Sequence, residues 1–471
     1  MSEIQLTGRS VSVAVSGTIV SGDPSAIFHG VSIDTRTIAP GQLFIAIRGE
    51  RFDGAEFADA AVAAGAAGLV MPRGRRPGAI AGGNSPVVPV VIEVEDTTSA
   101  LQWLARTVRR ESGTRVVAIT GSAGKTTTKE VTGAFLASQY RVVRNRGNLN
   151  NHIGLPLSLM ELRSRPDIAV VELGMNHAGE ISTLVGIAEP EVRVWTNVGE
   201  AHVGFFRSVD AIADAKAEIF EGASPSTLLV ANADDERVAG RTGKFAGRIT
   251  TFGIDREADV RATAVADRGV DGMAARMTTP RGAVEITTPL VGRGNLANVL
   301  AAAAVALEFD VPLTAIAERA AALRPAAHRG EILRLDGGIT VIDDSYNANP
   351  TATKRAIGVL AAAAGTRRIA VLGEMLELGE FARDLHAEVG RAAAAARIDR
   401  LVAVGGAAAA AVAAAAVSAG MAPASVEYVA ESDQAAEIVA ALVRPGDVVL
   451  VKGSRGIKTE RVVERLKAER G

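Results

Sequence analysis

The sequence contains no cysteine, and its net charge at pH 7 is only −2. The missing cysteine excludes disulfide bonds, zinc–thiolate sites and a catalytic thiol. A net charge this close to zero gives no electrostatic reason to expect binding to nucleic acid or to a membrane surface. We therefore do not expect nucleic acid among the partners of this protein.

Long hydrophobic runs are also missing. The most apolar tract, residues 407–416, consists mainly of alanine, which predicts a helix and is too short to span a bilayer. Residues 1–5 lack the basic-then-apolar order of a signal peptide. The sequence therefore predicts a cytoplasmic protein that does not insert into a membrane.

The composition is that of a globular protein, with 48% hydrophobic and 22% charged residues in a chain of 471. A chain of this length exceeds a single core and suggests about three domains. The alternation of strand and helix patterns predicts an α/β fold. The domains that we predict are a small N-terminal α/β domain (residues 1–95), a central phosphate-loop domain with a mainly parallel sheet (residues 96–327) and a C-terminal Rossmann-like domain (residues 328–471).

The N-terminal domain shows strand patterns at residues 31–36 and 43–47, followed by an alanine-rich helix over residues 55–64. The segment 72–89 is rich in Pro, Gly and Arg and predicts a loop. Three charged residues of this domain could contact an anionic ligand, although a charged residue of this kind is more often solvated surface: Arg36, Arg48 and Asp53.

The central domain carries a phosphate-binding loop. An apolar run at residues 116–119 predicts a strand, and a helix is expected from Thr128 onward. Backbone N–H groups of such a loop surround phosphate oxygens, its lysine reaches the outer phosphates and its threonine hydroxyl suits Mg²⁺. Ile119 stands where the common motif has glycine, so the loop is of a shorter kind. Its residues are Gly121, Ser122, Ala123, Gly124, Lys125, Thr126 and Thr127.

Polar residues follow two further predicted strands of this domain. Glu172 ends the apolar run 168–171, and His202 lies in the turn after the run 192–196. Ligands bind beyond the carboxyl ends of strands in open α/β sheets, so these residues are expected near the phosphate loop. Glu172 with Thr126 suits Mg²⁺, whereas histidine is an uncommon magnesium ligand. Lys216 lies on a predicted helix over residues 211–220, and nothing local distinguishes it from a solvated lysine.

The remainder of the chain predicts an extension of the central sheet and then an open α/β sheet. Short alternating strands over residues 247–288 favour an antiparallel extension, and residues 325–330 form a plausible hinge. Arg329 in this hinge could reach a γ-phosphate or form an interdomain salt bridge. Strands are predicted at 340–342, 369–372, 401–404 and 448–451. The polar turns 343–350 and 452–456 could bind ligands, or could serve the backbone alone.

Taken together, these motifs resemble the ATP-dependent Mur ligases of peptidoglycan synthesis and the related folylpolyglutamate synthetases. The short phosphate loop is the form that this family uses. Matching motifs run from residue 34 to residue 455, and they are residues 34–36, 52–54, 148–156, 172–176, 197–202, 344–350, 372–379 and 452–455. Within the family, the set resembles members that join D-alanyl-D-alanine to UDP-N-acetylmuramoyl-tripeptide through an acyl phosphate.

The resemblance implies a role for each matching residue. ATP and two Mg²⁺ ions are the expected cofactors, and the protein is expected to be a monomer. Lys125, Lys216, His202 and Arg329 are implied to be catalytic. The metal ligands implied are Thr126, Glu172, His202 and a carbamylated Lys216. The ATP site adds Asn295, Asn298, Arg329 and Asp344 to the loop. The UDP substrate site comprises Thr35, Arg36, Gly49, Asp53, Gly54, Asn148 and Asn151. The amino-substrate site comprises Tyr346, Asn347, Asn349, Lys452, Ser454 and Arg455.

Some features depart from the family pattern or leave alternatives open. Gly294 stands where the family usually has histidine, which puts one adenine-side contact in doubt. Asp343 adjoins Asp344, and either could contact the ribose. A family member that adds a diamino acid remains an alternative, although its Asp-Asn-Pro-Arg-type or Asp-Asp-Pro-Arg-type motif is not found. A phosphate-loop ATPase without ligase activity is the third hypothesis.

Overall fold

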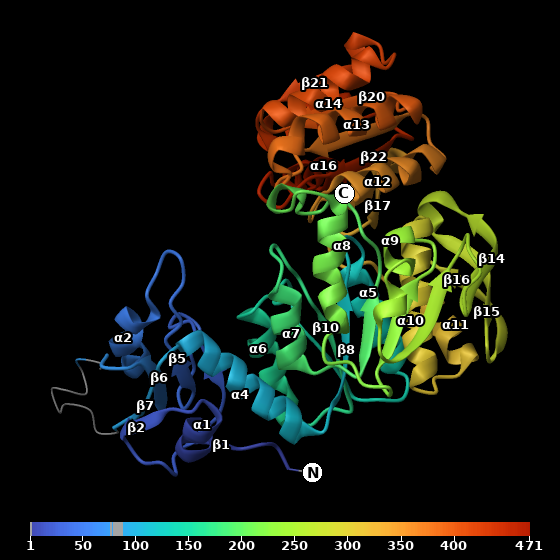
Figure 1. Ribbon diagram of the computed structural model, residues 1–471. Helices are drawn as coiled ribbons and strands as arrows, with labels where there is room; N and C mark the ends of the chain where they lie inside the picture. Colours follow the sequence, from blue (N-terminus) through green and yellow to red (C-terminus); the bar gives the residue numbers. More distant parts are fainter. Residues whose placement is uncertain (1, 76–77, 79–87) are drawn as a thin grey trace. The chain divides into compact units, whose positions relative to one another are not determined.

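The computed structural model describes residues 2–75, 78 and 88–471 (Figure 1). Most of the predicted loop over residues 72–89 lies outside the described residues. The chain forms two compact units: Met1–Ala118, Tyr140–Met175 and Gly179–Glu191 make the first, and Ile119–Gln139, Asn176–Ala178 and Val192–Gly471 make the second. Each unit is an α/β structure. The domain boundaries at residues 95 and 327 stay predictions.

The first unit contains a five-stranded sheet in the order β2–β7–β6–β5–β4. Its strands pair in parallel except β2, which runs antiparallel to β7. Apolar residues of β5, β6 and helix α2 form its core, among them Phe44, Leu69 and Ala61. The elements of this sheet region are β1 (Leu6–Thr7), α1 (Gly8–Ala14), β2 (Thr18–Ser21), β3 (Ile27–Phe28), β4 (Val31–Ser32), β5 (Leu43–Ile45), η1 (Gly54–Phe57), α2 (Ala58–Ala63), β6 (Gly68–Pro72) and β7 (Val90–Val94).

Helix α4 (Thr97–Ser112) follows this sheet, and Asp96 is its N-cap. The Asp96 carboxylate accepts a hydrogen bond from the Ser99 N–H at 2.6 Å, which satisfies one free donor of the first turn. Gly113, with φ of +69°, ends the helix in the left-handed conformation that favours glycine. The unit also contains β9 (Val142–Arg144), α6 (Gly154–Leu159), η2 (Met160–Ser164), β10 (Ile168–Glu172) and α7 (Glu180–Ala188).

The first part of the second unit is built on parallel strands. Strands β11, β12, β13 and β14 pair in parallel, and β15 and β16 continue antiparallel. The prediction of an antiparallel extension from residue 247 is therefore wrong for β13 and correct only from the β14–β15 pair onward. Alternating burial identifies a strand but carries no information about its direction. Strand β8 (Arg115–Thr120) leads into this part, whose elements are α5 (Lys125–Leu136), β11 (Val192–Trp195), η3 (Val203–Phe205), α8 (Val209–Ala217), η4 (Glu218–Phe220), β12 (Leu228–Asn232), α9 (Glu236–Ala239), η5 (Thr242–Lys244), β13 (Arg248–Gly253), β14 (Val260–Asp267), η6 (Gly269–Asp271), β15 (Met273–Thr279), β16 (Gly282–Thr288), α10 (Arg293–Glu308) and α11 (Leu313–Ala321).

The last part of the chain, drawn in orange and red in Figure 1, forms a six-stranded sheet in the order β17–β18–β22–β19–β20–β21. All its pairs are parallel except β17 with β18. Helices α15 and α16 pack on one face through residues such as Val439 and Val462. The sequence did not predict β17 or β21. The elements are β17 (Glu331–Leu335), η7 (Asp336–Gly338), β18 (Ile339–Asp344), α12 (Pro350–Ala362), β19 (Arg368–Gly373), η8 (Gly379–Phe381), α13 (Ala382–Ala395), β20 (Arg400–Val404), α14 (Ala407–Ser418), η9 (Pro423–Ser425), β21 (Val426–Val429), α15 (Ser432–Leu442), β22 (Val448–Lys452) and α16 (Glu460–Arg470).

The alanine-rich tract 407–416 lies within helix α14, as the sequence predicted. Among the described residues, no helix combines the length and apolar character needed to cross a membrane.

Candidate functional site

The phosphate loop joins β8 to α5 and depends on two glycines. Gly121 has φ of +150° and Gly124 has φ of +83°, conformations that other residues adopt only with strain. A Cβ atom at Gly121 would overlap Thr196 Oγ1, and one at Gly124 would overlap Asn298 Oδ1. Helix α5 starts at Lys125, three residues before the predicted start, because the helix continues directly from the loop. Its first N–H groups therefore lie where an anion would bind.

The segment 197–199 after β11 holds the loop through backbone and side-chain bonds. The Ser122 N–H donates to the Asn197 carbonyl at 3.0 Å, and the Ala123 N–H donates to Asn197 Oδ1 at 2.9 Å. Asn197 Nδ2 returns a bond to the Ala123 carbonyl at 2.9 Å. The Gly199 N–H donates to Ser122 Oγ at 2.9 Å. Lys125 Nζ donates to the Gly121 carbonyl at 2.8 Å, so the lysine folds back over its own loop.

Helix α10 supports the loop from another side through two asparagines. Thr128 Oγ1 donates to Asn298 Oδ1 at 3.2 Å, and Asn298 Nδ2 donates to Asn295 Oδ1 at 3.1 Å. Asn295 Nδ2 donates to the Val291 carbonyl at 2.9 Å. The structure thus places Asn298 against Gly124 and Thr128, and Asn295 next to Asn298. Asn298 therefore lies beside the phosphate loop, and Asn295 is connected to the loop through Asn298.

Lys216 lies on α8, and its side chain is 1% exposed. Burial lowers the pKa of Lys216 well below its ordinary value, and the nearby charge of Lys125 lowers it further. The amine is therefore far more readily neutral than that of a surface lysine. No local pattern in the sequence indicates this property, because the burial comes from the packing of α8.

His202 and Glu172 are the other metal ligands proposed from the sequence. His202 has φ of +62°, and its Nδ1 lies 2.5 Å from Glu377 Oε2, a pairing that lowers the pKa of Glu377. Glu172 is the last residue of β10 in the first unit, where its Oε1 accepts a bond from Asn150 Nδ2 at 2.7 Å. Among the described residues, no group of three or more histidine and acidic side chains is arranged to hold a metal ion.

Asp343 and Asp344 are the last two residues of β18 rather than part of the loop after it. Asp343 is fully buried and accepts a bond from Ser345 Oγ at 2.6 Å, and His328 Nδ1 lies 2.8 Å from it. Asp344 is a quarter exposed and pairs with Lys452 Nζ at 2.6 Å. Of the two acids, only Asp344 is therefore accessible to a ligand.

Two arginines face one aromatic ring in the last part of the chain. The Arg329 guanidinium carbon lies 4.0 Å from the centre of the Tyr346 ring, and that of Arg455 lies 5.8 Å from it. These distances suit cation–π contacts. The ring thereby brings together two cations from residues 126 positions apart in the sequence.

The remaining candidates of the second unit have structural partners. Lys452 Nζ also donates to the Asn347 carbonyl at 3.0 Å. Ser454 Oγ accepts a bond from the Leu376 N–H at 2.9 Å. Asn349 caps α12 by accepting from the Ala352 N–H at 2.9 Å. Gly294 lies close to the side chain of Arg355, which is 3.5 Å from the position that a Cβ atom would take.

The UDP-site candidates all belong to the first unit. Arg36 forms a two-point ion pair with Asp34, and its hydrogen bonds lower the pKa of Asp34 to about 2. Asp53 caps η1 by accepting from the Ala55 N–H at 3.0 Å. Asn151 Oδ1 accepts from the Gly154 N–H at 2.8 Å. Thr35 follows the short strand β4, Gly49 and Gly54 flank Asp53, and Asn148 precedes the turn that begins α6.

Sequence reasoning gave no role to several residues that support the site. Asn197 belongs to the motif 197–202 that matches the family, but its bonds to the phosphate loop were not predicted. Asp235 and Glu377 contact residues far away in the sequence, Val198 and His202 respectively. The sequence signal for Asp235 is its place shortly after the apolar run 228–231, where a helix N-cap is often found.

Comparison with known proteins assigns the chain to a family. Three family models match it: "Mur ligase family, catalytic domain" over residues 27–109, "Mur ligase middle domain" over 119–306 and "Mur ligase, glutamate ligase domain" over 328–455. The order of the three matches agrees with the three domains predicted from the sequence.

Relatives and solved structures cover nearly the whole chain. A Bacillus subtilis protein named UDP-N-acetylmuramoyl-tripeptide--D-alanyl-D-alanine ligase is 34% identical, over 98% of each chain. An Escherichia coli protein of the same name is 38% identical over 93% of each. The crystal structure of MurF from Acinetobacter baumannii has a TM-score of 0.88 and 31% identity, covering 99% of this chain and 100% of that one. The Thermotoga maritima MurF ligase in complex with ADP has a TM-score of 0.81 and 28% identity, covering 93% and 97%. This chain belongs to the Mur ligase family.

Proposed function

We propose that this chain joins D-alanyl-D-alanine to UDP-N-acetylmuramoyl-tripeptide while ATP is converted to ADP and phosphate. The observation that carries the proposal is the nearly full-length similarity to relatives named for this reaction. The phosphate loop, with Lys125 beside the N-terminus of α5, supports it by supplying the nucleotide site that the reaction needs.

The proposed chemistry has two steps. The γ-phosphoryl group of ATP passes to the terminal carboxylate of the UDP-linked peptide and forms an acyl phosphate. The amine of the dipeptide then attacks the acyl carbon, the amide forms and phosphate leaves. Lys125 and the N–H groups of residues 121–127 stabilise the charge on the transferring phosphoryl group. The acyl phosphate must be kept from water, which favours enclosure of the site during turnover.

The residues proposed as metal ligands suit magnesium in their chemistry. Thr126 and Glu172 offer a hydroxyl and a carboxylate, the hard oxygen donors that Mg²⁺ prefers. His202 and Lys216 would hold a second ion, with Lys216 as its carbamate. Mg²⁺, when bound, would neutralise part of the phosphate charge. The burial of Lys216 favours the neutral amine, which is the form that reacts with CO₂.

The remaining substrate contacts are assigned by chemistry and by resemblance. Arg329 and Arg455, both facing Tyr346, offer guanidinium groups that suit a carboxylate or a phosphate oxygen. Asn295 and Asn298 are proposed beside the adenine, and Asp344 at the ribose. Asn347, Asn349, Lys452 and Ser454 are proposed to border the dipeptide. The UDP-linked substrate is proposed to contact Thr35, Arg36, Gly49, Asp53, Gly54, Asn148 and Asn151.

The test is a phosphate-release assay with UDP-N-acetylmuramoyl-tripeptide and ATP, with and without D-alanyl-D-alanine. The proposal requires release that depends on both the UDP-peptide and the dipeptide. Release that requires UDP-N-acetylmuramoyl-dipeptide and a diamino acid instead would indicate the ligase of the preceding step. Slow release that ignores every UDP-peptide would indicate an ATPase without ligase activity.

We further propose that the protein acts in the cytoplasm as a monomer and binds no nucleic acid. The near-neutral net charge of −2 and the lack of a membrane-spanning helix among the described residues support this. Light scattering on the purified chain tests the monomer, because a dimer would double the measured mass.

A further inference from the structure

We infer that Asp235 is a positioning residue for nucleotide binding, because it anchors the segment that holds the phosphate loop. The inference rests on the proposed function only in taking the loop as the nucleotide site. The hydrogen bonds of Asp235 go to the N–H groups of Val198, Arg237 and Val238, and none of these residues belongs to the loop.

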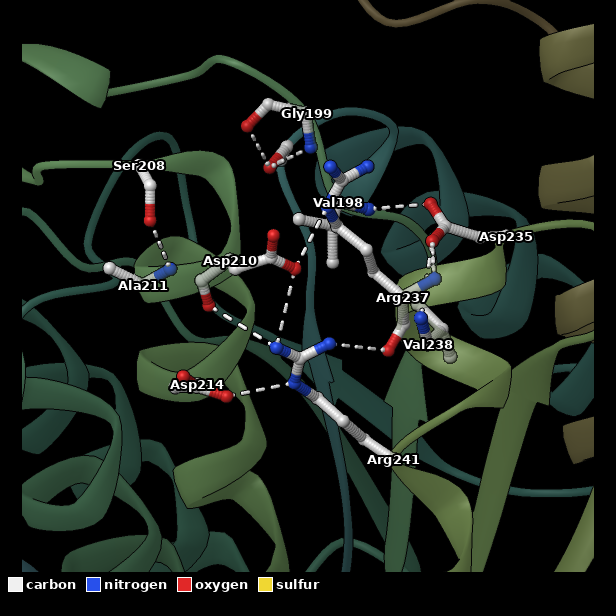
Figure 2. Close-up of polar contacts among 11 residues, drawn as sticks. Val198, Gly199, Ser208, Asp210, Ala211, Asp214, Asp235, Arg237, Val238 and Arg241 are labelled. Atoms are coloured by element: carbon white, nitrogen blue, oxygen red, sulfur yellow. Dashed lines mark hydrogen bonds and ion pairs between the residues drawn. The ribbon is translucent and has the colours of Figure 1, made fainter.

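The Asp235 carboxylate uses both oxygens at once (Figure 2). Oδ2 accepts a hydrogen bond from the Val198 N–H at 2.8 Å. Oδ1 accepts from the N–H groups of Arg237 at 3.0 Å and Val238 at 3.1 Å, which caps the start of α9. One side chain therefore links the start of α9 to the segment 197–199.

Val198 lies between the two residues that hold the phosphate loop. On one side, Asn197 accepts bonds from the N–H groups of Ser122 and Ala123. On the other side, Gly199 exchanges bonds with Ser122 Oγ at 2.9 and 3.1 Å. A shift of the Val198 backbone would therefore move both flanking contacts. The backbone N–H directions of the loop, which phosphate binding requires, would move with them.

The anchor itself is fixed, although α9 has only four residues. Val238 is fully buried in a cluster with Trp195 and Leu229. Arg241, whose side chain is 17% exposed, donates to Asp214 Oδ1 on α8 at 2.9 Å, and Arg237 donates to Asp210 Oδ1 at 3.2 Å. Exposed ion pairs contribute little stability singly, so the burial of Val238 is the main support of α9. Asp235 thus connects the 197–199 segment to a helix that is packed into a buried hydrophobic cluster.

The two-oxygen arrangement allows a test that separates positioning from helix capping. In Asp235→Asn the amide has one acceptor oxygen, so it can cap α9 or accept from Val198, but not both. Asparagine caps helices about as well as aspartate, so capping should survive. The Val198 N–H would then face an amide N–H and lose its partner.

Asp234 provides a matched control in the neighbouring position. Its Oδ2 accepts from the Ile254 N–H at 2.7 Å, and its Oδ1 accepts from the N–H groups of Asp255 and Arg256 at 3.0 and 2.8 Å. Asp234→Asn therefore also deprives one backbone N–H of its partner, but in the turn between β13 and β14. The two variants make the same chemical change in different places.

The experiment measures ADP affinity by calorimetry on the full-length wild type and both variants, and the KM for ATP in the phosphate-release assay. Loss of one such bond predicts roughly threefold to tenfold weaker ADP binding and a similar rise in the KM for ATP for Asp235→Asn. Asp234→Asn should bind ADP like the wild type, and neither variant should change the KM for the dipeptide. Melting temperatures should fall equally in the two variants.

Equal ADP affinity in Asp235→Asn and the wild type, or equal weakening in both variants, would overturn the inference. ADP binding does not require ligase turnover, so this outcome leaves the proposed reaction standing. A wild-type chain that failed to bind ADP would instead remove the nucleotide site, and the proposed function with it.

Discussion

Replacing Gly124 with alanine should weaken nucleotide binding through two separate effects. Gly124 precedes α5 with φ of +83°, a conformation that costs an alanine roughly 1–2 kcal/mol. The added Cβ would also overlap Asn298 Oδ1, which accepts the Thr128 hydroxyl. Displacing Asn298 would break this bond and the bond to Asn295, at a net cost of about 1 kcal/mol for each one lost.

These terms set the size of the effect on ADP binding. The variant can relax by moving the loop and its neighbours, and ADP must then restore the geometry that its phosphates require. If ADP binding must restore the left-handed conformation of residue 124 and one broken hydrogen bond, the free energy of ADP binding becomes less favourable by about 2–3 kcal/mol. At about 1.4 kcal/mol per tenfold change, the Kd for ADP then rises roughly 30-fold to 100-fold. Titration calorimetry with ADP in the presence of Mg²⁺ measures this directly.

Gly179 offers a control with the same backbone conformation. It precedes α7 with φ of +87°, and nothing lies within 4 Å of the position that its Cβ would take. Gly179→Ala should therefore lower the stability of the fold only through the strain of a left-handed alanine, and should leave the affinity for ADP unchanged. If Gly124→Ala bound ADP as tightly as Gly179→Ala, the reasoning from the loop geometry would be refuted.

Other perturbations have equally definite expectations. Lys125→Ala should lower the rate of phosphate release by at least about 100-fold, since the loop loses its only side-chain cation; a rate within tenfold of wild type would contradict the role. Lys216→Ala should be inactive, and added bicarbonate should not restore activity because the variant has no amine at this position to be carbamylated. Full activity of the variant would show that a carbamate at residue 216 is not needed. Hydrogen bonds from Arg110 and Arg106 lower the pKa of Glu189 from its ordinary 4.5 to about 2. A carboxyl group whose pKa is lower in the folded than in the unfolded protein stabilises the fold at pH values above its unfolded pKa. The wild type should therefore be more stable than Glu189→Gln above pH 4.5, and this difference should vanish as the pH falls toward 2. Urea unfolding at pH 6 and pH 3 checks this, and a difference independent of pH would contradict it.

Local patterns were sufficient where neighbours in the sequence decide the structure. The apolar runs before Gly121, Glu172 and Asn197 are strands β8, β10 and β11, and all are buried over most of their length. Asp96 caps α4 through a local hydrogen bond, because Asp96 and Ser99, whose N–H it accepts, are three residues apart. The phosphate loop was identifiable for the same reason.

Local patterns failed where the outcome depends on distant partners. Strands β17 and β21 lie at the edges of their sheet and are only partly buried, so their apolar signal is weak. The direction of β13 depends on which strands it pairs with, and the pattern within a strand does not record this. Asp343 and Asp344 could not be distinguished until β18 buried the first and left the second partly exposed at the carboxyl end of the strand.

The sequence by itself determined the α/β class, the phosphate loop and the resemblance to a ligase family, since these depend on short motifs and their order. The tertiary structure decided the state of individual side chains. It buried Lys216 and thereby lowered its pKa, set Arg329 and Arg455 against Tyr346, and connected Asp235 to the loop through Val198. Burial and hydrogen bonding depend on atoms brought together from distant parts of the chain. For that reason the loop's own residues could be named from the sequence, whereas the contacts through which Asn197 and Asp235 hold the loop in place could not.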